Sequence, residues 1–314
     1  MPDWFNPDPM GREGKVLMRL AMVMLQGSPR LARVDAEGRH CWPLAALAPH
    51  LPADMAGLIA AMAGGAIVPE PEGEGVPVAE SMLLAPLPNP PRNIFCVGKN
   101  YHAHAREFAG SGYDSSSTGA ADAIPQAPII FSKPFTAISG PSDDIPLHPG
   151  IDAAVDYEAE LAVIIGRGGR DITRADALSH VFGYTVVNDV TARDLQGTHK
   201  QWLLAKGIDG FCPMGPWIVT ADEIGDRPMR VTCSVNGEAR QDASTADLIF
   251  DVPELIATIS RSMALLPGDV IATGTPEGVG IGFKPPRFLR DGDVVECAIE
   301  GIGRIRNRLR KTGG

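Results

Sequence analysis

Three acidic side chains stand at alternate positions in the segment VDYEAELAVIIG, residues 155–166. In an extended strand Asp156, Glu158 and Glu160 point to one face, and the residues between them point to the other. Two carboxylates about 6 Å apart repel by roughly 3 kcal/mol at an effective dielectric constant of about 20. Because the run LAVII predicts a buried strand, the repulsion needs compensation from water, basic side chains or a bound cation.

A second candidate group lies in the segment VGKNYHAHAREF, where His104 and Glu107 are three residues apart. On a helix the two side chains share a face, so the carboxylate can orient the imidazole and stabilise its protonated form. A general base that takes a proton from water needs this support. The alternative is a solvated surface pair, which is the more common case for this motif alone.

The segment VVNDVTARDLQ places several polar groups at the end of an apolar strand. Asp189 ends the strand, and Arg193, Asp194 and Gln196 follow on one helical turn, so we expect them to face the same strand end. The alternative is a helix N-terminus capped by Asp189 or Thr191, with Arg193 and Asp194 as a surface charge pair.

Two further segments bring polar residues close to glycine. Lys206 lies among apolar and glycine neighbours in LLAKGIDGFCPMGPW, so it is either aimed into a cleft or extended to solvent, and the sequence slightly favours solvent. In IATGTPEGVGIG, Thr273 and Thr275 precede glycines that allow close backbone approach to a ligand. Neither this segment nor GRGGRD has the spacing of a phosphate loop, which argues against a nucleotide site.

The acidic residues indicate the kind of metal that would suit them. Glu158, Glu160 and Asp189 offer only oxygen atoms and have no cysteine partner, which favours Mg²⁺ or Mn²⁺ over Zn²⁺. Magnesium usually takes one or two protein carboxylates, so three would be a generous set.

The chain divides by composition near residue 85. Residues 1–85 are predicted to form a small α+β N-terminal domain with a linker: a strand within 16–25, a hairpin turning at 35–38 and a short helix within 53–65. Proline, glycine and glutamate are concentrated between residues 68 and 92, which is typical of a linker. Residues 86–314 would then form the catalytic domain.

Strands dominate the second part of the chain. Apolar runs follow one another from residue 93 onward, and the clearest helix is VPELIATISRSMALL. Turn signals at Asn236-Gly237 and Glu300-Gly301 predict antiparallel hairpins, so a strand-rich roll or sandwich is favoured over a parallel sheet. The polar, aperiodic stretch 109–126 is long for a loop and is typical of a lid or a disordered segment.

Composition excludes several classes of protein. The chain has 314 residues, 44% of them hydrophobic, and a net charge of -10 without a basic run, which argues against nucleic acid as a partner. The five cysteines are scattered singly, which argues against a structural zinc and an oxidising compartment. The apolar run at 16–25 is too short to span a membrane and contains Arg19, so we expect a cytoplasmic protein.

The ordered motifs together resemble the fumarylacetoacetate hydrolase family. NYHAHARE is similar to its NYxxHxxE segment, DYEAEL to its ExE segment, NDVTARDLQ to its D-x-[ST]-A-R-D-x-Q segment and TGTPEGVG to its TGTP segment. The resemblance extends from about residue 92 to residue 309. It implies an α+β, mostly β fold, a mixed β-sandwich roll of the catalytic-domain type, preceded by the small N-terminal domain.

The resemblance also implies roles for individual residues. It assigns Mg²⁺ or Mn²⁺ to Glu158, Glu160 and Asp189, water activation to a dyad of His104 and Glu107 that becomes ordered with a lid, and contacts with substrate or oxyanion to the remaining positions. These positions are Tyr101, Arg193, Gln196, Lys206 and Thr275, of which Lys206 is counted as catalytic. The family is usually dimeric, so a homodimer is expected. The stretch 111–124 is longer than the usual lid.

These parts predict a metal-dependent hydrolase that cleaves a C–C bond in a 2,4-dioxo acid, such as an acylpyruvate or a fumarylacetoacetate-like substrate. His104, held by Glu107, would deprotonate the attacking water, with Lys206 and Gln196 near the oxyanion. The alternatives are an isomerase of the 2-hydroxyhepta-2,4-diene-1,7-dioate type and a decarboxylase of a β-keto acid such as oxaloacetate. A non-catalytic binding protein with a structural cation is the alternative from another class.

Overall fold

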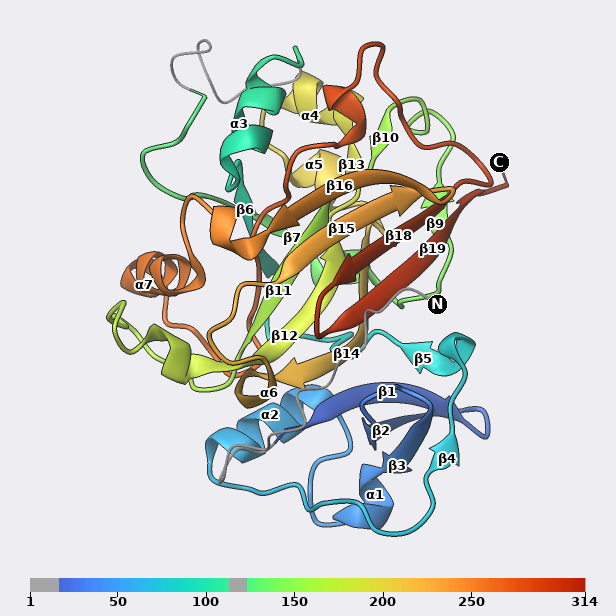
Figure 1. Ribbon diagram of the computed structural model, residues 1–314, viewed down its shortest axis with the longest axis vertical. Coiled ribbons are helices and arrows are strands. Elements are labelled where there is room, and N and C mark those ends of the chain that lie inside the picture. The colour runs from blue at the N-terminus through green and yellow to red at the C-terminus, as the bar shows by residue number, and fades with distance from the viewer. Residues whose placement is uncertain (1–16, 113–122, 314) are drawn as a thin grey trace.

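The computed structural model describes residues 17–112 and 123–313, and its strands form two main sheets and one short pair (Figure 1). The large sheet contains β1 (Arg19–Leu25), β2 (Ser28–Val34), β3 (His40–Pro43), β4 (Val76–Pro77), β5 (Leu83–Leu84), β6 (Ile94–Gly98), β7 (Ile129–Lys133), β8 (Ile138–Ser139), β11 (Ala159–Ile165), β12 (Val181–Asn188), β14 (Cys212–Thr220) and β17 (Val270–Ala272). The second sheet contains β9 (Ile145–Leu147), β15 (Arg230–Val235), β16 (Glu238–Ser244), β18 (Val294–Ile299) and β19 (Gly303–Lys311). The short pair is β10 (Val155–Asp156) with β13 (Thr191–Ala192).

In the described residues the helices are fewer than the strands. They are α1 (Leu44–Leu47), α2 (Met55–Ala63), α3 (His102–Ala109), α4 (Arg193–His199), α5 (Leu203–Lys206), α6 (Ala221–Ile224) and α7 (Val252–Ser262). Asp54 and Asp251 begin α2 and α7 by accepting backbone hydrogen bonds from Gly57 and Glu254, as N-cap residues do. The two helices predicted from the sequence are therefore present.

The order of the large sheet joins the N-terminal strands to the rest of the chain. It runs β4-β3-β2-β1-β14-β12-β11-β17-β6-β7, with β5 paired to β1 and β8 paired to β14. Strand β1 is antiparallel to β14, and Arg19 lies opposite Val219. The N-terminal strands thus extend the large sheet, while the division near residue 85 stays a prediction.

The second sheet lies over the middle of the large sheet and forms a two-layer sandwich (Figure 1). Strands β15, β18 and β19 face β11, β12 and β14 in turn. Leu161 and Val163 of β11 enter the core between the sheets, whereas Ala162 and Ile164 enter the core on the other face, which α2 helps to cover through Leu58. Because both faces of β11 are buried, its sequence contains the unbroken apolar run LAVII.

The hairpins form where the turn residues predicted them. Asn236 and Gly237 have φ of 53° and 80° between β15 and β16, the left-handed values that a two-residue hairpin turn requires. Residues 300 and 301 lie in the turn between β18 and β19. These antiparallel connections produce the strand-rich architecture expected from the sequence.

Helices α3, α4 and α5 gather at one end of the sandwich (Figure 1). Asn100 fixes the start of α3, because its Nδ2 donates to the carbonyls of Phe250 and Thr273 and its Oδ1 accepts from the Phe250 amide. Gly274 permits this approach: its φ is +100°, and a Cβ there would lie 2.8 Å from Cβ of Asn100. The end of β17 and the start of α3 are therefore held together beside the predicted site.

The structure also bears on what the sequence predicted for the cysteines, for membrane spans and for the long loop. All five cysteines are buried free thiols, and the Sγ atoms of Cys233 and Cys297 are 3.9 Å apart across β15 and β18. Among the residues that the structure describes, no helix is long and apolar enough to cross a bilayer. The predicted loop 109–126 falls mostly on residues 113–122, which lie outside the described residues.

Candidate metal centre and active site

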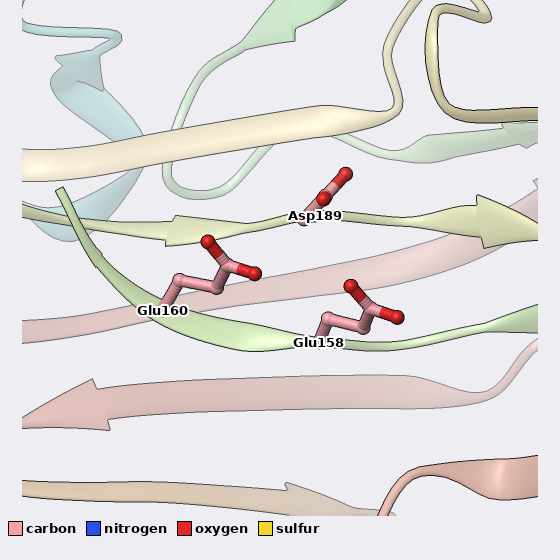
Figure 2. Close-up of side chains that lie close together, drawn as sticks. All are labelled: Glu158, Glu160 and Asp189. Carbon is pink, nitrogen blue, oxygen red and sulfur yellow. The ribbon is translucent and has the colours of Figure 1, made fainter. Parts of the chain in front are cut away.

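The predicted acidic residues converge where β11 begins and β12 ends (Figure 2). Glu158, Glu160 and Asp189 are buried, and one carboxylate oxygen from each lies within 4.8 Å of the other two. The Glu158 amide donates to Oδ1 of Asn188 at 2.9 Å, and the Asp189 amide donates to the carbonyl of Glu158 at 2.8 Å. These hydrogen bonds tie the two strand ends together, so three carboxylates form one cluster.

Two buried ammonium groups compensate part of this cluster. Nζ of Lys206 lies 2.7 Å from Glu158 Oε2, 2.7 Å from Asp189 Oδ2 and 2.9 Å from Oγ1 of Thr191. Nζ of Lys133 lies 2.7 Å from the other Asp189 oxygen, Oδ1. Sequence reasoning missed Lys133, and the only signal was a lysine at the end of the apolar run PIIFSK.

Lys206 does not extend to solvent, so the reading that the sequence slightly favoured is wrong. Only 2% of the residue is exposed, because α5 directs it toward the acidic cluster. Burial alone would lower the pKa of the ammonium, but the charges of Asp189 and Glu158 outweigh burial and raise that pKa. Lys206 therefore stays protonated at neutral pH.

Arg193 is a third buried cation, at the start of α4. Its Nη2 lies 2.7 Å from Glu158 Oε1, its Nε donates to Asp156 at 2.9 Å, and its Nη1 donates to Gln196 at 2.9 Å. The surface-pair alternative is wrong for Arg193. Asp194 is exposed, so the expectation that it faces the strand end is also wrong, because the helical turn directs it away from Arg193 and Gln196.

Asp156 is drawn away from the acidic cluster, although its sequence position predicted a shared face. Its carboxylate accepts hydrogen bonds from the Gly280 and Ile281 amides at 2.6 and 3.1 Å and pairs with Arg193. Burial raises the pKa of Asp156, partly opposed by Arg193. The residue thus orients Arg193 and does not join the three converging carboxylates.

Glu160 is the least compensated acid of the set. Its carboxylate accepts a hydrogen bond from the Gly274 amide at 2.9 Å, and no ion pair of Glu160 is present among the described residues. Burial, followed by the charges of Asp189 and Glu158, raises its pKa well above the ordinary value. For Glu158 burial also raises the pKa, but Lys206 and Arg193 outweigh burial and lower the pKa to about 2.

These charges test whether the residues fit a divalent cation. In the described part of the chain, each of Asp156, Glu158 and Asp189 forms an ion pair with a buried cation, whereas Glu160 forms none. The donor set consists of oxygen atoms, which hard cations such as Mg²⁺ and Mn²⁺ prefer. Each carboxylate oxygen can accept twice, so Glu158 and Asp189 retain acceptor capacity beside their ion pairs. The residues therefore fit such an ion.

The imidazole and carboxylate of α3 form the expected pair. Nδ1 of His104 lies 3.2 Å from Oε2 of Glu107, and the Gly278 amide donates to Oε1 of Glu107 at 3.0 Å. A Cβ at Gly282 would lie 1.8 Å from the same Oε1, so the glycine-rich segment packs directly on Glu107. Because His104 is buried, the solvated-pair alternative is wrong.

Thr275 and Tyr101 are the remaining predicted residues, and their side chains have different surroundings. Oγ1 of Thr275 accepts a hydrogen bond from Nε2 of Gln241 at 2.7 Å. Tyr101 precedes α3, and its buried hydroxyl has no hydrogen-bond partner within residues 17–112 and 123–313. Burial, assisted by Glu160, raises the pKa of the Tyr101 hydroxyl, which therefore stays protonated.

A small cavity of about 20 Å³ brings most of these groups together. Of the predicted residues, those that line it are His104, Glu158, Glu160, Arg193, Gln196, Lys206 and Thr275, whereas Asp189, Glu107 and Tyr101 do not line it. Sequence reasoning missed the other lining groups, Val97, Gly98, Lys99, Phe108, Phe131 and Trp202. A larger cavity of about 960 Å³ lies between the N-terminal strands and the second sheet, away from this chemistry.

The fold and the site define a class: strand-rich α+β enzymes with an acidic cluster beside a carboxylate-supported histidine. The family model described as "Fumarylacetoacetate (FAA) hydrolase C-terminal" matches residues 93–310. The chain belongs to this family, and the predicted fold class is confirmed by solved structures of the same fold.

Two relatives are both oxaloacetate tautomerases by name. The chain is 47% identical over 233 residues to "Oxaloacetate tautomerase YisK" of Bacillus subtilis (strain 168), covering 74% of each chain. It is 45% identical over 237 residues to "Oxaloacetate tautomerase FAHD2A, mitochondrial" of Bos taurus, covering 74% of this chain and 71% of the relative. The comparisons thus favour the predicted isomerase alternative over the predicted hydrolase.

Solved structures extend the likeness over the N-terminal part. The structure of fumarylacetoacetate hydrolase from Exiguobacterium antarcticum is 40% identical with a TM-score of 0.80, covering 94% of this chain and all of that chain. A 5-carboxymethyl-2-hydroxymuconate delta-isomerase from Mycobacterium smegmatis is 35% identical with a TM-score of 0.72, at the same coverage. Maleylpyruvate hydrolase from Sphingobium sp. SYK-6, in complex with manganese (II) and pyruvate, is 32% identical with a TM-score of 0.72, again at that coverage. Enzymatic function and a divalent metal are therefore supported over the binding-protein alternative.

Proposed function

We propose that the protein is a divalent-metal-dependent isomerase that interconverts the keto and enol forms of a short 2-oxo diacid of the oxaloacetate type. The observation that carries the proposal is a small cavity lined both by His104 and by the acidic residues Glu158 and Glu160. A base and a cation site must act on adjacent atoms of one small molecule for this reaction. The two oxaloacetate tautomerases that the chain resembles support the same substrate class.

Glu158, Glu160 and Asp189 would hold the cation through their carboxylate oxygens. When bound, the cation supplies positive charge that stabilises negative charge developing on a substrate oxygen. Lys206 and Arg193 add two fixed positive charges to the cavity lining, which favours an anionic acid over a neutral ligand. The buried site also excludes most water, so these charges act in a medium of low dielectric constant.

His104 would move the proton. Because Nδ1 faces Glu107, the atom left for substrate is Nε2, and an Nδ1–H that donates to the carboxylate makes Nε2 the basic atom. Nε2 takes the proton from C3 of the keto acid, the C–H electron pair forms the C2–C3 double bond, and the π pair of the C2 carbonyl moves onto its oxygen. That oxygen takes a proton from water, and Nε2 returns its own proton to water. The reverse sequence converts enol to keto.

The predicted hydrolysis of 2,4-dioxo acids is a second candidate, because the same dyad can deprotonate water and two structural neighbours are hydrolases. Water would attack C4, and the C3–C4 bond would break to give pyruvate and a carboxylic acid when the substrate is an acylpyruvate. Decarboxylation of oxaloacetate, to pyruvate and CO₂, is the third outcome that the same cation site could serve.

One NMR experiment in D₂O with Mg²⁺ or Mn²⁺ separates these outcomes, using oxaloacetate and acetylpyruvate. We expect deuterium exchange at C3 of oxaloacetate to exceed the spontaneous rate and to stop when a chelator is added. Decarboxylation gives pyruvate from oxaloacetate, and hydrolysis gives pyruvate and acetate from acetylpyruvate. His104→Ala and Glu107→Ala should each slow the exchange by at least about a hundredfold, the scale of general-base catalysis. An unchanged rate in His104→Ala, or no acceleration by the parent protein, would contradict the proposal.

A further inference from the structure

Three aromatic side chains form one wall of the cavity, and we name Phe108, Phe131 and Trp202 the aromatic wall. The Trp202 ring contacts Phe131 edge-on with centroids 5.1 Å apart, and Phe108 edge-on at 6.1 Å. The wall borders the charged groups directly, because Nζ of Lys206 lies 5.2 Å from the Phe131 ring centre and Cζ of Arg193 lies 5.9 Å from that of Phe108. A bound acid would therefore touch charge on one side and aromatic carbon on the other.

Trp202 packs against the backbone of β6 and against both other members of the wall. A Cβ at Gly98 would lie 2.3 Å from Cζ3 of the indole, so the ring packs on the bare backbone of β6. Phe108 and Phe131 hold the ring on other sides. Its carbonyl also accepts the amide of Lys206 at 3.0 Å, which ties the backbone of Trp202 to the turn that carries the ammonium. The indole therefore cannot retreat toward β6 when a ligand enters.

The cavity is small compared with any 2-oxo acid, since about 20 Å³ holds little more than one water molecule. An acid that enters must displace lining side chains, and each added methylene extends a ligand by about 1.3 Å, given C–C bonds of about 1.5 Å. Because Trp202 is wedged against β6, a longer acid meets a group that does not yield. Resistance should therefore rise steeply with chain length.

We propose that Trp202 sets the chain length of the acid and restricts the site to four carbons. This inference rests on the proposed function and deepens it, since it names a side chain that separates oxaloacetate from longer 2-oxo diacids. A hydrophobic wall discriminates by roughly 10- to 200-fold for each methylene. Trp202 is a specificity-determining residue in this account, and it takes no part in proton transfer.

The test compares oxaloacetate, 2-oxoglutarate and 2-oxoadipate, which have four, five and six carbons, by C3 deuterium exchange with Mg²⁺. We expect Trp202→Ala to raise the ratio of kcat/KM for 2-oxoglutarate to kcat/KM for oxaloacetate by at least about tenfold. Leu204→Ala, an exposed position on α5, is the matched control and should leave the ratio unchanged. A variant that loses rate on all three acids by one common factor would overturn the inference.

A double-mutant cycle tests the wedge separately from folding. Gly98→Ala alone places a methyl group against the indole, and should lower kcat/KM for oxaloacetate by at least about tenfold. In the Trp202→Ala background the same change should cost less than about threefold, because the obstructing ring is gone. Equal costs in both backgrounds would mean that the indole is not held by β6, and the inference would fail.

Binding distinguishes this inference from the proposed function. If the parent protein exchanges protons on none of the acids, the proposed isomerase is wrong, and calorimetry with Mn²⁺ and the same acids still measures the length preference. The parent should then bind 2-oxoglutarate at least about tenfold more weakly than oxaloacetate, and Trp202→Ala should remove this difference. Binding without any dependence on length would overturn the role of Trp202.

Discussion

Glu160→Gln should stabilise the metal-free protein even though it removes a proposed metal ligand. The carboxylate is buried next to Asp189 and Glu158, and its pKa is raised well above the ordinary value by burial first and by these charges second. Glutamine keeps an oxygen that can accept the hydrogen bond from the Gly274 amide while it removes the charge. Functional residues that cost stability are common in proteins.

The structure gives the size and the pH dependence of the effect. Carboxylates within 4.8 Å of one another repel by about 3.5 kcal/mol at an effective dielectric constant of about 20, and attraction to Lys206 offsets part of this repulsion. We expect a net gain of about 1–3 kcal/mol. Because the pKa of Glu160 is raised in the folded state, the protonated side chain contributes its full stability to the fold below the unfolded pKa of about 4.3. This stability is lost as the pH rises through the folded pKa. The gain should therefore vanish near pH 4 and be complete well above the folded value.

Urea unfolding with EDTA at pH 4 and pH 8 measures this gain, with exposed Glu74→Gln as the control. Adding Mg²⁺ should reverse the order, because binding to the folded parent adds stability that Glu160→Gln cannot gain to the same extent. A loss of stability in EDTA, or an equal response of both proteins to Mg²⁺, would refute the reasoning.

Two further predictions concern the partners of Glu160. Lys206→Met leaves Glu158 and Asp189 without their shared ammonium group, so the free energy of unfolding in EDTA should fall by about 3–5 kcal/mol. Mg²⁺ should restore part of this loss. A fall of less than about 1 kcal/mol would contradict the ion pairs. For Glu158, whose pKa is about 2, stability of about 3 kcal/mol should be present above pH 4.3 or so and lost as pH falls through about 2. Acid titration of Glu158→Gln should lack this loss, and an unchanged acid dependence would count against the low pKa.

Local patterns predicted a large part of the fold. Because a strand repeats every two residues, alternate positions in residues 155–166 were expected to share a face, and Leu161 and Val163 do share the face that meets the second sheet. Asn236-Gly237 predicted its hairpin because few residue pairs accept two left-handed conformations. The pairing of β1 with β14 was not predicted, because long-range strand partners leave no local signal.

The candidate site was predictable where one segment carries the chemistry. His104 and Glu107 share a turn of α3, so their spacing alone predicted the pair. Lys133 and Trp202 reach the site from β7 and from the turn before α5, and such convergence depends on the tertiary fold. The burial of Lys206 was mispredicted because the sequence does not reveal the two carboxylates that keep its ammonium charged.

The most direct test of the account is where a divalent cation binds. Crystals soaked in MnCl₂, with data collected at the manganese absorption edge, should give an anomalous peak about 2.2 Å from oxygen atoms of Glu158, Glu160 and Asp189. A parallel soak of Glu160→Gln should weaken or abolish the peak. Occupied manganese elsewhere in the molecule with none at these three carboxylates, at saturating metal, would contradict the central claim.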